Sequence, residues 1–461
     1  MKIVSFGLLK VFTYRILKFF LPQKIYKKLT SSDVVSRIAY GSIWSFFGTS
    51  ISRIIVLLTM ILVARSLGDE KFGELGTIQA FSSMVGVLMG MVLGNTLTRF
   101  IAQHSIKDPI KTGKIIALLL TTSTFTVISS AFLIILFSDF LSKELFQAPH
   151  LEHALQLSSI LVLSSAFRGI QNGIFSGLEK FELIAKLNIF DSILAVFLIL
   201  SFLYLGVDGV ILGASIAAIS ASLLGQVFLK RELSQRGIKL TIKGCWENYS
   251  ILISYSLPGA LAVLVTAPVL WYAMILVSQS PNGFAEVGVY NAAYQFHGPM
   301  IFIPMIFTSV SIPVLVQEWE SDSFKRFLKV YFGIVSSMLA VSIPLVLILS
   351  FSSPWIMSLY GPGFSESWWV LVLLLVAAPF HGLSKISDST LYAMNKAWHV
   401  FWIKTLWGSS LIIITMILAN EYGSIGLSLA FFISYLIVGF LSMLIILQLV
   451  KNKTSSSSSK T

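Results

Sequence analysis

The sequence predicts an all-α polytopic membrane protein, and three observations support this prediction. Hydrophobic residues make up 56% of the 461-residue chain, charged residues make up 12%, and the mean hydropathy is +0.85. A soluble domain of this length does not need so apolar a composition. Apolar runs of about 20 residues, the length that crosses a bilayer as a helix, recur along the chain. Finally, the basic residues gather between alternate runs, as they do in multi-pass proteins.

Twelve runs qualify as transmembrane helices because each is free, or nearly free, of charged residues, which are costly inside a bilayer. The predicted spans are residues 39–64, 75–98, 115–138, 152–175, 184–205, 209–229, 251–277, 287–315, 329–350, 367–391, 399–419 and 424–449.

The distribution of lysine and arginine predicts how these spans are oriented. The terminal segments and the alternate loops hold 27 of the 33 basic residues, whereas the opposite loops hold three, namely Arg65, Lys71 and Lys143. The positive-inside rule then places both termini and the central loop in the cytoplasm of a cell whose inner or plasma membrane holds the protein. The net charge of +12 reflects this topology and not nucleic-acid binding.

The two halves of the chain resemble repeats of each other. Phe72–Gly76 after the first span matches Phe284–Gly288 after the seventh, and Phe175–Phe181 after the fourth matches Leu391–Ala397 after the tenth. A third match, Gly206–Val210 with Gly423–Leu427, keeps the same order at a nearly constant offset. Because each half has six spans, the copies enter the membrane from the same side and form parallel repeats. The expected result is two six-helix bundles with a cleft between them.

This organisation divides the chain into five segments. The first is a basic amphipathic segment expected to lie on the cytoplasmic leaflet, since its lysines interrupt the apolar run that a signal peptide would need. Two bundles and a polar linker follow, and a Ser- and Lys-rich tail is expected to be disordered. Their ranges are residues 1–36, 37–230, 231–249, 250–450 and 451–461.

No catalytic motif is present, which argues against an enzyme. The sequence lacks a GxxxxGK[ST] loop, a GxSxG elbow and an HExxH motif, and its loops are too short for a nucleotide-binding domain. Its one cysteine, Cys245, excludes an internal disulfide and a cysteine cluster for metal. We therefore predict no cofactor, no metal site and an ion or substrate gradient as the energy source.

Three basic residues inside predicted spans are the candidates for substrate binding: Arg53, Arg168 and Lys385. Charges at such depth usually face a partner or an aqueous cavity. Arg168 and Lys385 lie 217 residues apart, within one residue of the repeat offset, so we expect them to face each other across the cleft. Such a pair suits a dianionic group such as a diphosphate. For each residue the alternative is a structural ion pair or snorkelling to the interface.

Candidates for ion coupling or charge neutralisation are His297, Asp191 and Asp388, which also lie within spans. A histidine can change its charge near neutral pH, although a hydrogen-bonded structural role for His297 is an equal alternative.

The turn Leu67–Gly73, the following Thr98–Phe100, the segment Gly177–Phe181 and the opening Ser256–Pro258 of the seventh span resemble bacterial polysaccharide biosynthesis flippases. These are the Wzx-type O-antigen and exopolysaccharide translocases of the multidrug/oligosaccharidyl-lipid/polysaccharide exporter superfamily. The resemblance runs from about Ile38 to Val450 and implies a V-shaped two-bundle fold with alternating access.

The resemblance also implies a function. The expected substrate is an undecaprenyl-diphosphate-linked oligosaccharide, moved from the cytoplasmic to the outer leaflet with membrane lipids around it, with H⁺ or Na⁺ as coupling ion and the polysaccharide assembly machinery as partner. A cation-coupled multidrug exporter of the same superfamily is the first alternative. A membrane-embedded polysaccharide polymerase is the second, and it would need a large catalytic outer loop.

Overall fold

The computed structural model describes residues 33–105, 107–320 and 324–458, and every regular element within them is helical. The main helices are α3 (Asp33–Gly86), α4 (Val92–His104), α5 (Pro109–Leu136), α7 (Glu152–Gly177), α8 (Phe181–Phe202), α9 (Val207–Gln235), α10 (Leu257–Ser278), α11 (Gly283–Glu320), α12 (Phe324–Phe351), α15 (Trp368–Ala393) and α16 (Ala397–Ser458). Short elements lie between them: α6 (Ser138–Phe140), α13 (Ser353–Ser358), α14 (Pro362–Ser365), π-helices η1 (Val87–Met91), η2 (Leu141–Leu145) and η6 (Leu252–Ser256), and 3₁₀-helices η3 (Pro149–Leu151), η4 (Leu203–Leu205) and η5 (Cys245–Asn248).

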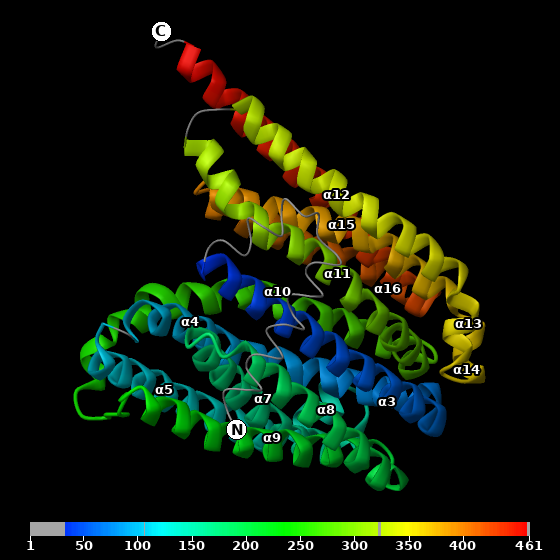
Figure 1. Ribbon diagram of the computed structural model, residues 1–461. Helices are drawn as coiled ribbons and strands as arrows, with labels where there is room; N and C mark the ends of the chain where they lie inside the picture. The colour runs from blue at the N-terminus through cyan, green and yellow to red at the C-terminus, as the bar shows by residue number, and fades with distance from the viewer. Residues whose placement is uncertain (1–32, 106, 321–323, 459–461) are drawn as a thin grey trace.

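The main helices form two groups (Figure 1). Helices α3, α4, α5, α7, α8 and α9 make up one group, and α11, α12, α15 and α16 run together in the other. The groups converge at the end that carries α13 and α14 and diverge toward the end that carries the C-terminus, which gives the molecule a V-shaped outline. Helix α10 packs mainly against α16 and thus joins the second group.

The twelve predicted spans fall within these helical segments except for Phe137 and Ser367, which are turn residues. Seven helices of the described residues are long and apolar enough to cross a membrane. Two of the long helices are interrupted at a glycine. Gly68 in α3 has φ 81° and Gly423 in α16 has φ 47°, a region that side chains rarely adopt, so each helix consists of two segments joined at a kink. The all-helical membrane fold is confirmed, and twelve crossings remain a prediction.

The repeat deduced from the sequence is visible in the backbone. Glu179 and Asn395, which are 216 residues apart, both have a left-handed conformation, with φ 58° and φ 59°. The turns around them share the same hydrogen bonds: the Lys180 amide donates to the Phe175 carbonyl at 2.8 Å, and the Lys396 amide donates to the Leu391 carbonyl at 2.8 Å. The connection from α7 to α8 is therefore built like the connection from α15 to α16.

The two groups touch closely at the converging end. A Cβ added to Gly73 of α3 would lie 1.7 Å from the Phe284 carbonyl oxygen of α11. Phe72 packs edge-on against Tyr360 and Phe364, and all three side chains are buried. Burial raises the pKa of the Tyr360 phenol, which therefore stays neutral. We call this contact, from Asp69 to Gly76 with Phe284 to Gly288, the outer seal, because the predicted topology places it outside.

The C-terminal segment differs from the prediction. Helix α16 continues to Ser458, although residues 451–461 were expected to be disordered. The Lys453 ammonium donates to the Trp319 carbonyl at 2.9 Å and lies 4.3 Å from the centre of the Trp319 ring, so it ties the end of α16 to α11. At the other end, residues 1–32 of the predicted amphipathic segment lie outside the described residues.

Candidate functional site

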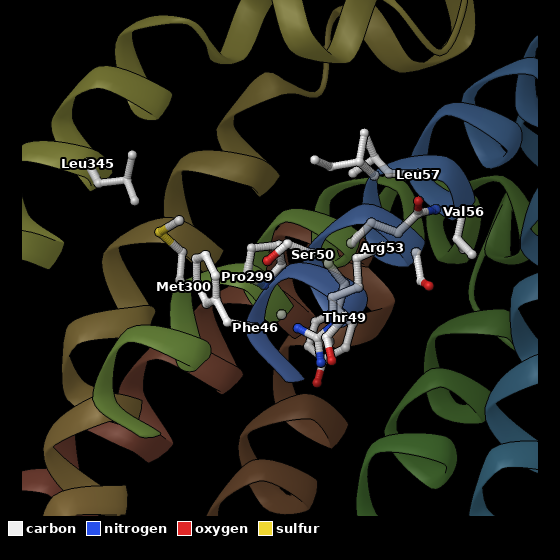
Figure 2. A pocket seen from close by; sticks show the side chains of 14 residues that line it. Phe46, Thr49, Ser50, Arg53, Val56, Leu57, Pro299, Met300 and Leu345 are labelled. Atoms are coloured by element: carbon white, nitrogen blue, oxygen red, sulfur yellow. The ribbon is translucent and has the colours of Figure 1, made fainter. Parts of the chain in front are cut away.

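A cavity of about 660 Å³ lies between the two groups of helices. It is bounded by α3 from Phe46 to Leu57, by α11 from Tyr294 to Met300, and by Leu345 of α12. Figure 2 shows these side chains converging from helices of both groups. The cavity therefore occupies the position of the predicted cleft.

Most of the cavity wall is apolar, with a few polar groups from one face of α3. Thr49, Ser50 and Ser52 supply hydroxyls, and Gln295 of α11 supplies an amide. The Ser52 hydroxyl is buried and has no hydrogen-bond partner among the described residues.

Arg53 is the one charged side chain among the described residues that line this cavity. It is exposed, and its Nη1 would lie 3.7 Å from a Cβ added to Gly298 of α11. Residues 49, 50 and 53 share a face of α3 through helical periodicity, which brings the guanidinium and two hydroxyls to one side. This group suits an anion flanked by hydroxyl-bearing groups.

Arg168 lies elsewhere, inside the first group of helices. It is only 8% exposed, its Nη2 donates to Asn188 Oδ1 at 2.7 Å, and the same atom lies 3.8 Å from Asp191 Oδ2. Both partners come from α8, so Arg168 joins α7 to α8. Its Nη1 is buried and has no hydrogen-bond partner among the described residues.

Lys385 belongs to a charged group in the second half. It is exposed on α15, and nearby Lys404 of α16 forms an ion pair with Asp388, with Nζ and Oδ2 2.6 Å apart. The Lys404 ammonium also lies 3.3 Å from the Ser384 hydroxyl. The second half therefore holds two cations beside one carboxylate.

The repeat offset shows that Arg168 and Lys385 do not occupy equivalent positions in the two halves. Arg168 with Asn188 and Ser384 with Lys404 are equivalent bonded pairs, each position shifted by 216 residues. Lys385 is displaced from this register by one residue, which is about 100° around a helix. Each cation has its contacts in its own half, and their juxtaposition across the cleft remains a prediction.

His297 is buried in the second half and bonds to two groups. Its Nδ1 lies 3.0 Å from the Leu374 carbonyl oxygen, and its Nε2 lies 3.0 Å from Nδ1 of His381. The His381 ring stacks on Tyr435 with ring centres 4.0 Å apart. His381 was missed from sequence, although its position four residues before Lys385 places it on the same face of a predicted span.

Solved structures of a transporter and of a flippase match this chain. The inward-facing conformation of a multidrug resistance MATE family transporter of the MOP superfamily covers 90% of this chain and 99% of its own, with a TM-score of 0.77 and 15% identity. Lipid II flippase MurJ in an inward closed conformation covers 88% of this chain and 87% of its own, with a TM-score of 0.70 and 18% identity. At these identities the likeness concerns the fold.

The chain has the fold of these multi-pass membrane proteins, with a cavity between its two groups of helices. The chain belongs to the polysaccharide biosynthesis protein family, whose model matches residues 38–319, more than half of the sequence. The family resemblance seen in the sequence motifs is thereby confirmed.

Two relatives match over most of their length. A putative O-antigen transporter of Shigella flexneri is 24% identical over 77% of this chain and 85% of its own. An uncharacterized membrane protein of Methanocaldococcus jannaschii is 23% identical over 89% of this chain and 98% of its own.

Proposed function

We propose that the protein is a flippase that moves a lipid-diphosphate-linked oligosaccharide from the cytoplasmic to the outer leaflet by alternating access. Membership of the polysaccharide biosynthesis family supports this proposal, and so does the similarity to a protein described as a putative O-antigen transporter. The two moving units are residues 37–230 and 250–450, joined by the linker 231–249.

The observation that carries the proposal is Arg53 in the cavity between the halves. A guanidinium offers a fork of donors that matches the oxygens of a diphosphate. The hydroxyls of Thr49 and Ser50 and the amide of Gln295 are available to sugar hydroxyls beside it. The apolar remainder of the wall lowers the local dielectric constant and so strengthens the attraction between charges. The isoprenoid tail of the substrate stays in the lipid, so the protein does not have to bury it.

Arg168 and Lys385 take a secondary part in this proposal. Each places a positive charge in one half of the molecule, and together they make the path between the halves attractive to an anion. Opening of the diverging end, as in Figure 1, admits the head group from the cytoplasm, and separation of the outer seal releases it. An inward gradient of H⁺ or Na⁺ resets the carrier, and the assembly machinery of the polysaccharide receives the product.

The cavity argues against a drug exporter that carries organic cations. A site for such cations needs carboxylates or aromatic faces free of competing positive charge. The charged side chain among the described residues that line the cavity is Arg53, which repels cations. Efflux of cationic dyes by the reconstituted protein would favour this alternative.

The proposal is tested by complementation of a bacterial host whose own O-antigen transporter gene is deleted. The chain should restore surface polysaccharide, and Arg53→Gln should reduce it strongly while the protein still reaches the membrane. Loss of a hydrogen bond to a charged group costs about 1.5–3 kcal/mol, which is roughly a ten- to hundredfold loss of affinity.

Lys230→Gln is the matched control, because it removes a positive charge from an exposed position of α9 that lies outside both the cavity and the outer seal. Arg168→Ala and Lys385→Ala measure the contributions of the other two cations. Normal surface polysaccharide in the Arg53→Gln cells would refute the assignment of the binding site.

A further inference from the structure

A hydrogen-bonded pair of histidines lies in the second half of the molecule, between α11 and α15. His297 is 1% exposed, and its Nε2 is 3.0 Å from Nδ1 of His381. The two rings are nearly parallel, with centres 5.3 Å apart. His381 is half-buried. A hydrogen-bonded histidine pair inside a helix bundle is unusual because each imidazole also has to satisfy its other ring nitrogen.

The hydrogen bonds fix where the hydrogens of the neutral pair lie. The Leu374 carbonyl can only accept, so Nδ1 of His297 carries a hydrogen and donates to it at 3.0 Å. In a neutral imidazole the other nitrogen is then an acceptor, so Nε2 of His297 accepts from Nδ1 of His381. This leaves Nε2 of His381 as the basic nitrogen of the pair.

The pair lies directly behind the wall of the central cavity. Tyr294 stacks on His297 with ring centres 5.6 Å apart, and Tyr294 itself lines the cavity. Gln295 and Gly298, which flank His297 in α11, are also lining residues. A change in the hydrogen bond between His381 and His297 is therefore transmitted to the cavity wall that faces Arg53.

Charged and titratable groups surround the pair on every packed helix. Lys385 and Asp388 lie on the same helix as His381, one and two turns further on. Lys404 of α16 is paired with Asp388 at 2.6 Å. Among the described residues, Tyr294 of α11 stacks on His297, Tyr290 stacks on Tyr294, and Tyr435 of α16 stacks on His381. Tyr331 of α12 is hydrogen-bonded to Ser387 of α15. These phenols are neutral across physiological pH.

We propose that the His297–His381 pair is the proton-binding site through which protonation controls the opening of the two halves. The role of this site in transport rests on the proposed flippase function, but proton binding itself does not. Two imidazoles provide nitrogen ligands, whereas a sodium ion prefers oxygen ligands. Within the described residues, no group of three or more histidine, cysteine, aspartate or glutamate side chains gathers to hold a metal ion. The pair is therefore a site for a proton.

One proton from the aqueous phase forms an N–H bond at Nε2 of His381, and no other bond breaks. The His381 imidazolium then donates through Nδ1 to neutral His297, so the bond between α15 and α11 becomes charge-assisted and stronger. The new charge also adds to those of Lys385 and Lys404, with Asp388 as the carboxylate beside them. An anion in the cavity and a proton on the pair consequently affect each other's binding, as linkage requires.

The proposal is tested with spin labels on the full-length protein in nanodiscs. Cys245→Ala removes the one native cysteine, and new cysteines at the exposed positions Lys107 and Lys329 carry the labels. Pulsed dipolar spectroscopy then measures the separation of the halves at their diverging end from about pH 8 to about pH 5, the range in which histidine titrates. We expect the ratio of open to closed molecules to change by roughly fivefold or more, the usual lower range of allosteric coupling.

His381→Asn separates proton binding from structure. The asparagine amide reproduces the Nδ1–H donor to His297 but has no second ring nitrogen to accept a proton. The pH response should disappear in this variant and, independently, in His297→Gln, while His399→Gln, a histidine of α16 outside the pair, should keep it. A wild-type response that persists in both pair variants, or no response in the wild type, would overturn the proposal.

Failure of the proton-site proposal can be distinguished from failure of the proposed flippase function. The label experiment uses no substrate, so the pH response can be present in a protein that flips no lipid. Conversely, substrate flipping with no pH response would sustain the flippase and refute the proton site.

Discussion

Gly73 of α3 and Gly288 of α11 lie backbone to backbone at the outer seal. A Cβ added to Gly73 would be 2.8 Å from the Gly288 amide nitrogen, and one added to Gly288 would be 2.1 Å from the Asp69 carbonyl oxygen. Both glycines belong to the motif that repeats between the halves, Phe72–Gly76 and Phe284–Gly288. The repeat thus places its smallest residues where two helices from opposite halves must approach most closely.

A larger side chain at this seal should hold the outer end open. Gly288→Leu places carbon atoms where the backbone of α3 now lies, and backbone cannot move aside as a flexible side chain can. Spin labels at the exposed outer positions Glu144 and Glu366 should report a longer distance than in the unsubstituted protein. Gly333→Leu is the control, since nothing lies within 4 Å of a Cβ at Gly333. Equal distances in both variants would contradict the role of the seal.

Removal of the Asn188 side-chain amide should lower the stability of the protein, because Arg168 donates a hydrogen bond to it. Asn188→Ala deprives a buried guanidinium of its 2.7 Å acceptor and leaves Asp191, 3.8 Å away, as its remaining partner. Loss of a hydrogen-bond partner at a buried group costs about 1–3 kcal/mol. Thermal unfolding of the detergent-purified protein should show a lower midpoint. Asn188→Asp, which keeps an acceptor, should unfold close to the wild-type temperature. Identical midpoints for Ala and Asp would show that the contact contributes nothing.

Substitutions of Lys404 and Asp388 should have non-additive effects on the stability of the protein. Lys404→Met leaves the Asp388 carboxylate, whose side chain is 9% exposed, without its 2.6 Å partner, and breaking a buried pair in this way costs about 3–5 kcal/mol. Replacing both residues, Lys404→Met with Asp388→Asn, removes the uncompensated charge and should recover most of the loss. A double variant whose destabilisation equals the sum of the single ones would mean that the two side chains do not interact.

Much of the fold was predictable because membrane helices are long apolar runs. The bilayer allows few other solutions for a buried backbone, so hydrophobic length alone located the helices. The repeat was predictable as well, since turns such as those at Glu179 and Asn395 need particular residues in a left-handed conformation. The prediction of a disordered tail was wrong for residues 451–458, which continue α16. The hydrogen bond from Lys453 to the Trp319 carbonyl depends on which helices become neighbours, so the sequence did not indicate it.

The candidate site was predictable only in part. Arg53, Arg168 and Lys385 stood out because charge is rare in apolar spans, but their partners come from other helices. Lys404 was not among the candidates, and its pairing with Asp388 depends on how α16 packs on α15. The His297–His381 bond joins residues far apart in sequence, and no local pattern marks it. A cleft between the halves followed from the repeat, but the side chains that line the cavity depend on how the two halves pack.

The most direct test of the central claim is flipping by purified protein. Proteoliposomes would carry an undecaprenyl-diphosphate-linked oligosaccharide with a labelled sugar, and a membrane-impermeant glycosidase would report how much of it becomes accessible at the outer surface. Liposomes with the wild-type protein should expose substrate from the inner leaflet much faster than protein-free liposomes or liposomes with Arg53→Gln, and those with Lys230→Gln should behave as wild type. Equal rates with and without the protein, or with and without Arg53, would contradict a flippase whose diphosphate site is the cavity between the halves.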